Sequence, residues 1–360
     1  MSLFADIFKL VYATYRQYLY TSLAIIGLVW KRLTEGDDYF REYTYPKPDC
    51  LTYGWNHKYV QLKNVRMHYV DEGDVDSSDD VLLMVHGFPE FWYSWRFQLN
   101  GLKHAFRCIA IDMRGYNETD KPTTTSDYNL KFLIEDIREF IDKLGLRRVV
   151  LVAHDWGAIV SWRFTMLYPE MVHKLIILNV PHPAAFFKVY TESKEQRAKS
   201  WYIYLFQSST IPELAMRVNR MAMLEKMFRG RKAGIRNSNN FTDEDMLAWK
   251  HVFSQKHAIT GPLNYYREMF NAPTIASEKM RIRPPVLIIW GERDAFLDKR
   301  GAIESVDYCR YARVHLIPTA SHWVQQDEPT LVNHLIEEFV RDDVDRVNYR
   351  IIRELEKSKI

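Results

Sequence analysis

The chain has 360 residues and a formal net charge of +3, and its basic residues are scattered, which argues against a nucleic-acid-binding surface. Apolar residues make up 47% of the chain and charged residues 26%, enough for one large or two medium domains with a sizeable core. The three cysteines are far apart and odd in number, so they fit neither a disulfide framework nor a zinc site.

The N-terminal region contains an uncharged stretch, "LYTSLAIIGLVW" at residues 19–30, which Lys31 and Arg32 follow. As a helix, residues 17–30 would be about 21 Å long, whereas a bilayer core is roughly 30 Å thick. A full span has to extend back past Arg16, whose long side chain can reach the membrane interface. We expect residues 1–32 to form a short membrane anchor. A helix lying on the membrane interface and a helix packed on the soluble domain are the alternatives.

The next segment, residues 33–58, is polar and contains Pro46 and Pro48, which predicts a linker. Residues 59–73 are typical of two strands with a turn at Asn64. Apolar strands and amphipathic helices then alternate as far as residue 180, and the alternation resumes after residue 280. These strands are expected within residues 81–89, 107–122, 149–153, 174–179, 285–294 and 313–323. Strands that are nearly all apolar predict an α/β fold with a mostly parallel, doubly wound sheet.

Residues 181–280 interrupt the alternation with helical stretches rich in Met, Tyr, Trp and Arg, and with no convincing strand. A helical insertion in a doubly wound sheet predicts a lid over the carboxyl ends of the strands. We therefore expect an α/β core of residues 59–180 and 281–341 with a helical lid formed by residues 181–280. The tail, residues 342–360, carries one apolar stripe at helical spacing and is expected to form a surface helix.

A tight turn between a strand and a helix is predicted in "VVLVAHDWGAIVS", residues 149–161. Its centre follows the pattern small-x-nucleophile-x-small, with Asp155 at the position of the nucleophile. Asp294 and His322 also follow predicted strands, and the chain order nucleophile, acid, histidine is that of the α/β-hydrolase arrangement. Asp298 is the alternative to Asp294 as the acid.

A carboxylate in place of the usual serine indicates a different reaction. Asp155 is ionised at neutral pH, so it can attack an sp³ carbon directly and become an alkyl ester. His322 would then activate a water that hydrolyses the ester, and Asp294 would orient the histidine. The backbone N–H groups of Phe88 and Trp156 are the candidates to stabilise the oxyanion that forms. This chemistry needs no cofactor and no metal, and we expect neither, nor a protein partner.

Five segments together resemble the α/β-hydrolase-fold epoxide hydrolases, and most of all the membrane-anchored epoxide hydrolases 3 and 4 of animals. They are "HGFPEFWYSWRFQL" (86–99), "DMRGYNETDKP" (112–122), "AHDWGA" (153–158), "GERDAF" (291–296) and "ASHWVQQDEP" (320–329). The resemblance implies hydrolysis of an epoxide, with lipid or fatty-acid epoxides as the substrate class. It also implies a single-pass protein of the endoplasmic reticulum membrane, with a soluble or peripherally bound form as the alternative.

The resemblance further implies two lid tyrosines that protonate the epoxide oxygen. The segment "YIYLFQ" points to Tyr202, with Tyr204 nearby as a residue that could be confused with it. The segment "GPLNYYR" points to Tyr266, which precedes the arginine, with Tyr265 as the weaker candidate.

Two other functions stay open at this point. A haloalkane dehalogenase would use the same nucleophile, but its second halide donor is often an Asn directly after "HG", where this chain has Phe88. A ligand-binding protein on the same fold, with an intact triad and negligible turnover, is the other alternative. The paired tyrosines favour the epoxide hydrolase.

Several polar residues near these segments are expected to be structural. We expect His86 to support, by hydrogen bonding, the turn that carries the Phe88 N–H group. Asp112 and Arg114 are expected to form a pair under the same loop. Asp327 is expected to cap the last core helix.

Two asparagines lie in Asn-x-Thr sequons, Asn117 and Asn240, which we interpret as chance matches and not as glycosylation sites. Asn117 also replaces the glycine that is usual in its loop, and asparagine tolerates left-handed backbone angles.

Overall fold

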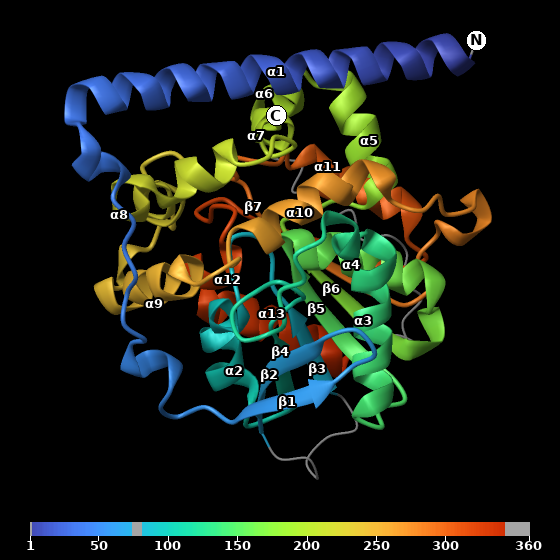
Figure 1. The fold of residues 1–360 in the computed structure, drawn as a ribbon. Coiled ribbons are helices and arrows are strands. Elements are labelled where there is room, and N and C mark those ends of the chain that lie inside the picture. The colour runs from blue at the N-terminus through green and yellow to red at the C-terminus, as the bar shows by residue number, and fades with distance from the viewer. Residues whose placement is uncertain (1, 74–80, 343–360) are drawn as a thin grey trace.

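The computed structural model of the protein describes residues 2–73 and 81–342, and an eight-stranded sheet lies at its centre (Figure 1). The strands are β1 (His57–Gln61), β2 (Arg66–Glu72), β3 (Val81–Val85), β4 (Arg107–Ile111), β5 (Val149–His154), β6 (Val172–Leu178), β7 (Val286–Gly291) and β8 (Ala312–Ile317). Their order in the sheet is β1-β2-β4-β3-β5-β6-β7-β8. Strand β2 is antiparallel to both its neighbours, and the other neighbouring pairs are parallel. This confirms the mostly parallel α/β fold and the β1–β2 hairpin with its turn near Asn64.

Helices cover both faces of the sheet. Helices α3 (Leu130–Lys143) and α4 (Asp155–Leu167) pack together on one face, and α2 (Arg96–Leu102) and α13 (Pro329–Arg341) pack together on the other (Figure 1). Helix α3 shows why such segments form helices. Asn129 caps its first turn by accepting a hydrogen bond from the Lys131 N–H, and its buried apolar residues recur at helical spacing. The expected helix at residues 342–360 lies outside the described residues, apart from Asp342.

A helical insertion joins β6 to β7. It contains α5 (Pro183–Glu192), α6 (Lys194–Lys199), α7 (Trp201–Leu205), α8 (Ile211–Arg229), α9 (Asp243–Ser254) and α10 (Thr260–Glu268), and residues 181–280 include no strand. Helix α9 begins with a capping box, in which Thr242 and Asp245 satisfy each other's backbone N–H groups. Short helices α11 (Arg300–Ser305) and α12 (Val324–Asp327) follow β7 and β8.

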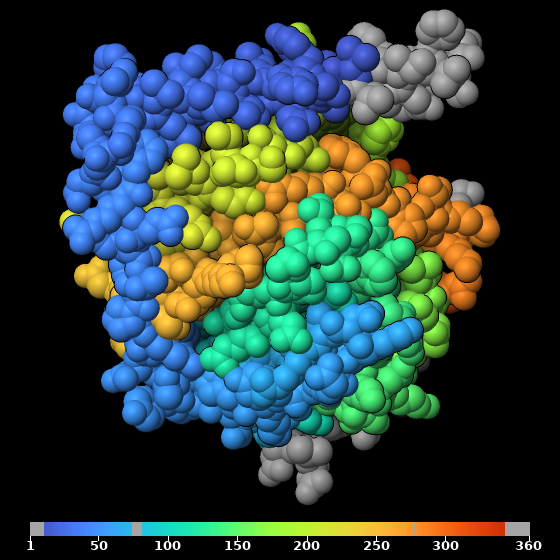
Figure 2. Space-filling model, in the orientation of Figure 1, coloured from blue at the N-terminus to red at the C-terminus, as the bar shows by residue number. Residues whose placement is uncertain are grey.

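Helix α1 (Ser2–Glu35) lies across the lid at the top of Figure 1 and packs on α7 and α8. Figure 2 shows the same N-terminal segment against the lid in space-filling form. Across the described ranges, no helix combines the length and the apolar character that crossing a membrane requires. After α1 the chain follows the lid: the Tyr45 hydroxyl donates to the Arg220 carbonyl at 3.1 Å, and the Cys50 N–H donates to Glu244 Oε1 at 3.2 Å.

Parallel strands bring their carboxyl ends to one edge of the sheet, beneath the lid. Strands β3, β5 and β7 are buried along their whole length, so that they form a rigid base. The loops that leave β3, β5, β7 and β8 carry Phe88, Asp155, Asp294 and His322, respectively. The fold therefore brings residues that are far apart in the sequence to one place.

Candidate active site

Asp155 lies in a sharp turn between β5 and α4, and its φ of 47° is unusual for a residue other than glycine. The turn is possible because two residues packed near it are glycines. A Cβ added to Gly157 would lie 2.2 Å from the Val85 carbonyl oxygen. A Cβ added to Gly87 would lie 2.2 Å from the Cβ of Asp155. The two glycines thus let the loop after β3 approach the turn that presents the carboxylate.

The Asp155 carboxylate accepts a hydrogen bond of 2.7 Å from the Phe88 N–H at Oδ1. Burial raises the pKa of this carboxyl, but the contacts with His322 and the Phe88 N–H outweigh burial and hold the pKa below its usual value. The N–H of Trp156 belongs to the first turn of α4, where N–H groups have no partner within the helix. His86 supports the loop after β3 by two hydrogen bonds, with the Gly87 carbonyl at 2.9 Å and with the Met113 N–H at 3.0 Å.

His322 lies between two carboxylates. Its Nδ1 is 2.7 Å from Asp294 Oδ2, and its Nε2 is 3.4 Å from Asp155 Oδ2. Burial lowers the pKa of this histidine, but Asp294 and Asp155 outweigh burial and raise the pKa to about 10. Asp294 is itself fixed by the Phe296 N–H at 2.7 Å and by Asn179 Nδ2 at 2.8 Å.

Asp298 does not reach His322. It accepts a hydrogen bond of 3.0 Å from the Arg300 N–H at the start of α11, which places it at a helix end. The structure thus brings Asp155, His322 and Asp294 together and leaves Asp298 outside the group.

Tyr202 and Tyr266 come from α7 and α10 of the lid, and their ring centres lie 6.0 Å apart. The ring of Tyr266 packs edge-on against Trp156 at 5.0 Å and against Phe88 at 5.4 Å. Burial raises the pKa of both phenols, and the Asp155 carboxylate raises both further. Both tyrosines therefore keep their protons at neutral pH and lie within the electrostatic influence of Asp155.

The two competing tyrosines have other partners. The Tyr204 hydroxyl lies 2.5 Å from the Tyr190 hydroxyl, on the side of α7 that faces α1. The Tyr265 hydroxyl donates to the Arg114 carbonyl at 2.7 Å. The hydroxyls of both adjacent candidates are thus bonded to groups outside the site.

A buried glutamate–histidine pair under the site was not expected from the sequence. Glu90 Oε2 lies 2.6 Å from His154 Nδ1, and His154 Nε2 lies 2.8 Å from the backbone carbonyl oxygen of His322. Glu90 also accepts a hydrogen bond of 3.3 Å from the Gly87 N–H. The pair thus connects the loop after β3, the turn of Asp155 and the loop of His322. Glu90 is the last residue of the segment "HGFPE" and His154 the second residue of "AHDWG", and this membership was the signal that the sequence offered.

The expected pairing of Asp112 with Arg114 is wrong. Asp112 lies 2.6 Å from His68 Nδ1, whereas Arg114 forms two hydrogen bonds, of 2.6 and 2.8 Å, with Asp136 of α3. The Asp112 N–H still bonds to β2 at the His68 carbonyl, but the chain has turned toward α3 by residue 114.

The expectation that Asp327 caps the last core helix is also wrong. Helix α13 begins after Glu328 and has no side-chain cap. Asp327 ends α12 and accepts hydrogen bonds of 2.6 Å from both the N–H and the hydroxyl of Ser321, and one from the Asn237 N–H at 3.3 Å. It therefore ties the loop of His322 to the lid.

The two sequon asparagines are both engaged in hydrogen bonds. Asn117 has a φ of 38° and donates to Asp112 at 2.7 Å. Asn240 donates to the backbone carbonyls of Gln326 and Asp327 at 2.8 and 3.2 Å.

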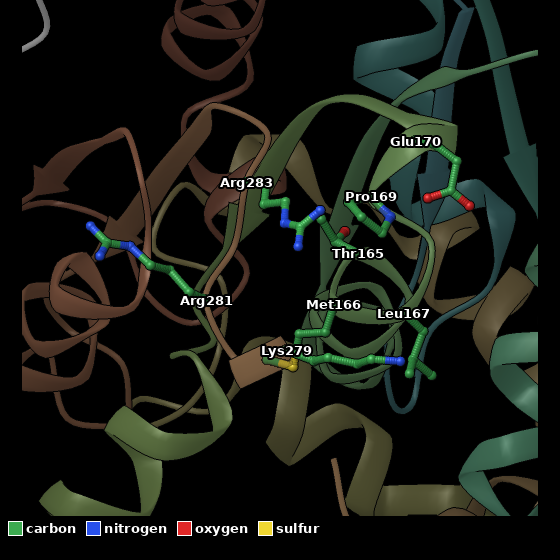
Figure 3. Close-up of a pocket in the computed structure, with 8 residues that line it drawn as sticks. All are labelled: Thr165, Met166, Leu167, Pro169, Glu170, Lys279, Arg281 and Arg283. Carbon is green, nitrogen blue, oxygen red and sulfur yellow. The ribbon is translucent and has the colours of Figure 1, made fainter. Parts of the chain in front are cut away.

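A surface pocket of about 210 Å³ lies at the far end of α4, away from Asp155. Its lining residues are Thr165, Met166, Leu167, Pro169, Glu170, Lys279, Arg281 and Arg283, and the Arg281 side chain points away from it (Figure 3). Asp155 is the first residue of α4 and Leu167 the last, so roughly 18 Å of helix separates the pocket from the site. Within the described residues, no group of three or more His, Cys, Asp or Glu side chains is arranged to hold a metal ion.

Comparison with known proteins identifies the family. The family model described as "alpha/beta hydrolase fold" matches residues 80–329. Epoxide hydrolase 2 of Caenorhabditis elegans is 64% identical over 359 residues, which cover 100% of this chain and 99% of that protein. Epoxide hydrolase 4 of Homo sapiens is 40% identical over 291 residues, which cover 80% of this chain and 79% of that protein.

A comparison with solved structures identifies the same family as the sequence comparison. A mutant epoxide hydrolase from Bacillus megaterium, complexed with its product, a naphthyloxy-propane-1,2-diol, superposes with a TM-score of 0.71 at 30% identity. The match covers 79% of this chain and 100% of that one. The chain therefore belongs to the epoxide hydrolases of the α/β-hydrolase fold.

Proposed function

We propose that this protein converts an epoxide to a vicinal diol through an ester on Asp155. The Asp155 carboxylate attacks one epoxide carbon, the C–O bond breaks with its electron pair on oxygen, and Tyr202 or Tyr266 donates a proton to that oxygen. The products of this step are a hydroxyalkyl ester and a tyrosinate. The observation that carries the proposal is the buried group of Asp155, His322 and Asp294 together with two lid phenols whose ring centres lie 6.0 Å apart, one of them packed on the residues next to Asp155.

His322 acts in the second step of the proposed reaction. In the free enzyme its pKa of about 10 keeps the ring protonated at neutral pH. Esterification removes the charge of Asp155, so one of the two carboxylates that favour the imidazolium is lost and the pKa of His322 falls. The ring therefore releases one proton to solvent. The neutral ring then accepts a proton from a water that attacks the ester carbonyl of Asp155.

The tetrahedral intermediate would carry its negative charge on an Asp155 oxygen. The Phe88 N–H already donates to Oδ1 of Asp155, and the Trp156 N–H is the second proposed donor. When the intermediate collapses, its hydroxyl proton passes to the leaving oxygen and the diol departs. The proton on His322 returns to the tyrosinate, and the ring takes up a proton from solvent again as Asp155 regains its charge. The sum is one epoxide and one water converted to one diol.

We further propose that the substrate is an apolar epoxide, such as a lipid or fatty-acid epoxide. The rings near the reacting groups are aromatic hydrocarbon surfaces: Phe206 packs on Tyr266 at 5.0 Å, and Phe296 packs on Tyr202 at 5.7 Å. Such surfaces favour an alkyl chain over a charged substrate. Two phenols also suit an alkoxide leaving group, which needs a proton, better than a halide, which needs none.

A single turnover in heavy-oxygen water tests the mechanism. With enzyme in excess over the epoxide, the water oxygen is expected in Asp155 and the first diol formed is expected without label. Mass spectrometry of the peptide that contains Asp155 and of the diol measures both. Label in the diol and none in Asp155 would rule out the ester. A panel of terminal, fatty-acid and aryl epoxides would then define the substrate class.

The outer face of α1 supports a proposal on location. We propose that α1 lies on a membrane interface, with the endoplasmic reticulum as the expected membrane. Ile26 and Trp30 are each 64% exposed, and other apolar side chains share this face. They are Tyr15, Tyr18, Leu23, Val29 and Leu33. A helix with one apolar face in contact with water binds readily at the boundary between headgroups and acyl chains.

Vesicle flotation tests this location. The full chain is expected to float with phosphatidylcholine vesicles, and Ile26→Asp is expected to reduce the bound fraction several-fold. Ile303→Asp, at a partly exposed isoleucine of α11, is the matched control. Equal flotation of the two variants would contradict the proposal.

A further inference from the structure

The lid helix that carries Tyr202 is too short to be stable without its neighbours. Helix α7 has 5 residues and no side-chain cap at its start, and isolated helices of fewer than about 12 residues are marginal in water. Its place over Asp155 must therefore be set by its neighbours. On one side α6, which precedes α7, is fixed to the loop after β7. Gln196 Nε2 donates to the Phe296 carbonyl at 3.0 Å, and Lys199 Nζ donates to the Asp294 carbonyl at 3.1 Å.

On the other side α7 is covered by α1, which crosses it at the top of Figure 1. The contact centres on Arg16, whose guanidinium donates to the hydroxyl oxygens of Tyr12 at 2.7 Å and Tyr20 at 2.8 Å. The same guanidinium lies 5.0 Å from the ring centre of Tyr204 in α7. A cation over an aromatic face contributes about 0.5–2 kcal/mol, depending on its exposure to water.

The partners of Arg16 continue the contact along α7. Tyr12 meets the Tyr204 ring edge-on at 6.4 Å, and Tyr20 packs on Trp201 at 5.7 Å. Trp201 and Tyr204 flank Tyr202 in the chain. Tyr202 projects from the same short helix toward Tyr266 and Phe296, on the side of the proposed site. The contacts described for the Arg16 guanidinium are all with tyrosine side chains.

We infer that α1 is a strap that fixes Tyr202 over Asp155, and that Arg16 is the positioning residue of this strap. The inference rests on the proposed function, because it depends on Tyr202 as a proton donor. Arg16 does not touch the reacting atoms. It acts by holding Tyr204, and with it the helix from which the Tyr202 phenol reaches the epoxide oxygen.

The strap makes a prediction that separates the two chemical steps. Ester formation needs the phenol, whereas ester hydrolysis needs His322 and the backbone N–H groups of Phe88 and Trp156. Arg16→Met, in the full chain, is expected to slow ester formation about tenfold. This is less than the ~10²-fold loss of rate that a 1 Å misplacement of a catalytic group can cause. The rate of ester hydrolysis is expected to stay unchanged. Rapid mixing followed by acid quench measures both rates from the amount of alkylated Asp155.

Three further variants make the test specific. Arg32→Met changes an arginine of the same helix that lies beyond α7 and is expected to behave as wild type. Arg16→Lys keeps the charge and is expected to restore part of the rate. Arg16→Met in a Tyr202→Phe background is expected to cause no additional loss, because the effect passes through the Tyr202 hydroxyl.

The outcomes distinguish this inference from the proposed function. A wild-type protein without epoxide turnover would contradict the proposed function itself. With active wild type, an unchanged rate of ester formation in Arg16→Met would overturn the strap. Equal slowing of both steps, or the same loss in the Tyr202→Phe background, would also overturn it. If Arg16→Met does not fold, the double variant Tyr12→Phe with Tyr20→Phe removes the two acceptors, keeps the rings, and is judged by the same criteria.

Discussion

Asp155 and His322, on the sheet side of the proposed site, are fixed by hydrogen bonds to backbone and carboxylate groups, whereas Tyr202 and Tyr266, on the lid side, are surrounded by aromatic rings. Hydrogen bonds between charged groups and backbone N–H groups are short and directional. Ring packing is less directional and tolerates small shifts. The sheet side is therefore built for a fixed nucleophile, whereas the position of the lid phenols depends on packing and, for Tyr202, on the contacts of α7 with α1 and α6.

The two sides of the site also contribute differently to the two proposed chemical steps. Ester formation needs groups from both sides, since the carboxylate attacks from the sheet and the proton comes from the lid. Ester hydrolysis needs the sheet side until the proton returns to the lid. Changes on the sheet side are expected to affect both steps, and changes in the lid mainly the first.

The largest effect is expected from Asp155→Asn. The amide is a poor nucleophile for an sp³ carbon, so steady-state turnover should fall by about 10⁴-fold or more. Initial diol formation by freshly purified protein measures this loss. Slow deamidation would restore aspartate, so a rising rate on storage, with the corresponding mass change at residue 155, would support the assignment. Full initial activity of the variant would refute it.

Replacing both lid phenols is expected to have the next largest effect. Tyr202→Phe and Tyr266→Phe should each slow ester formation about tenfold, because one phenol can still donate, and the double variant should lose about 10²-fold or more. Tyr265→Phe is the matched control, since its hydroxyl bonds to the Arg114 carbonyl and not to the site. Loss of activity in Tyr265→Phe that equals the loss in Tyr266→Phe would show that the adjacent tyrosines had been assigned incorrectly.

The sheet side below the nucleophile offers a smaller effect through Glu90→Gln. The amide keeps the shape of the side chain but removes a charge that His154 and the Gly87 N–H share. Weakening a buried charge-assisted hydrogen bond costs about 1–3 kcal/mol of folding stability. Because the loop after β3 would shift, both chemical steps should also slow by about tenfold. Quench-flow rates and thermal unfolding measure the two effects separately. Glu135→Gln on α3, which removes one partner of Arg138, is the control, and an equal kinetic loss there would contradict the role of Glu90.

The elements and residues on the sheet side of the site are also those that the sequence predicts best. Each of these elements has a local sequence pattern. The strand is an apolar run, the tight turn has small residues around Asp155, and the helix shows apolar residues at helical spacing. The chain order of Asp155, Asp294 and His322 then follows from the topology of the fold. The fold class and the family could be predicted for the same reason.

Side-chain partners across the fold could not be predicted, because they depend on the direction each loop takes. Asp112 and Arg114 are two residues apart, yet they pair with different elements. Asp327 carries the usual signature of a helix cap but bonds to Ser321 and the lid. The choice of Tyr202 over Tyr204 came from the family resemblance alone, since rings in an aromatic lid look alike in sequence.

The pH dependence of the two steps is expected to be the smallest of these effects, and it tests how the sheet side changes during turnover. Ester formation needs ionised Asp155, whose pKa lies below its usual value, so its rate should vary less than about twofold between pH 6 and 9. Hydrolysis needs neutral His322. The pKa of His322 is about 10 beside the charged Asp155 and falls once Asp155 is an ester. The rate of hydrolysis should therefore rise with pH and level off below pH 10. The fraction of ester at steady state should fall over the same range. A hydrolysis rate that keeps rising to pH 10 or above would show that the charge on Asp155 does not control the basicity of His322.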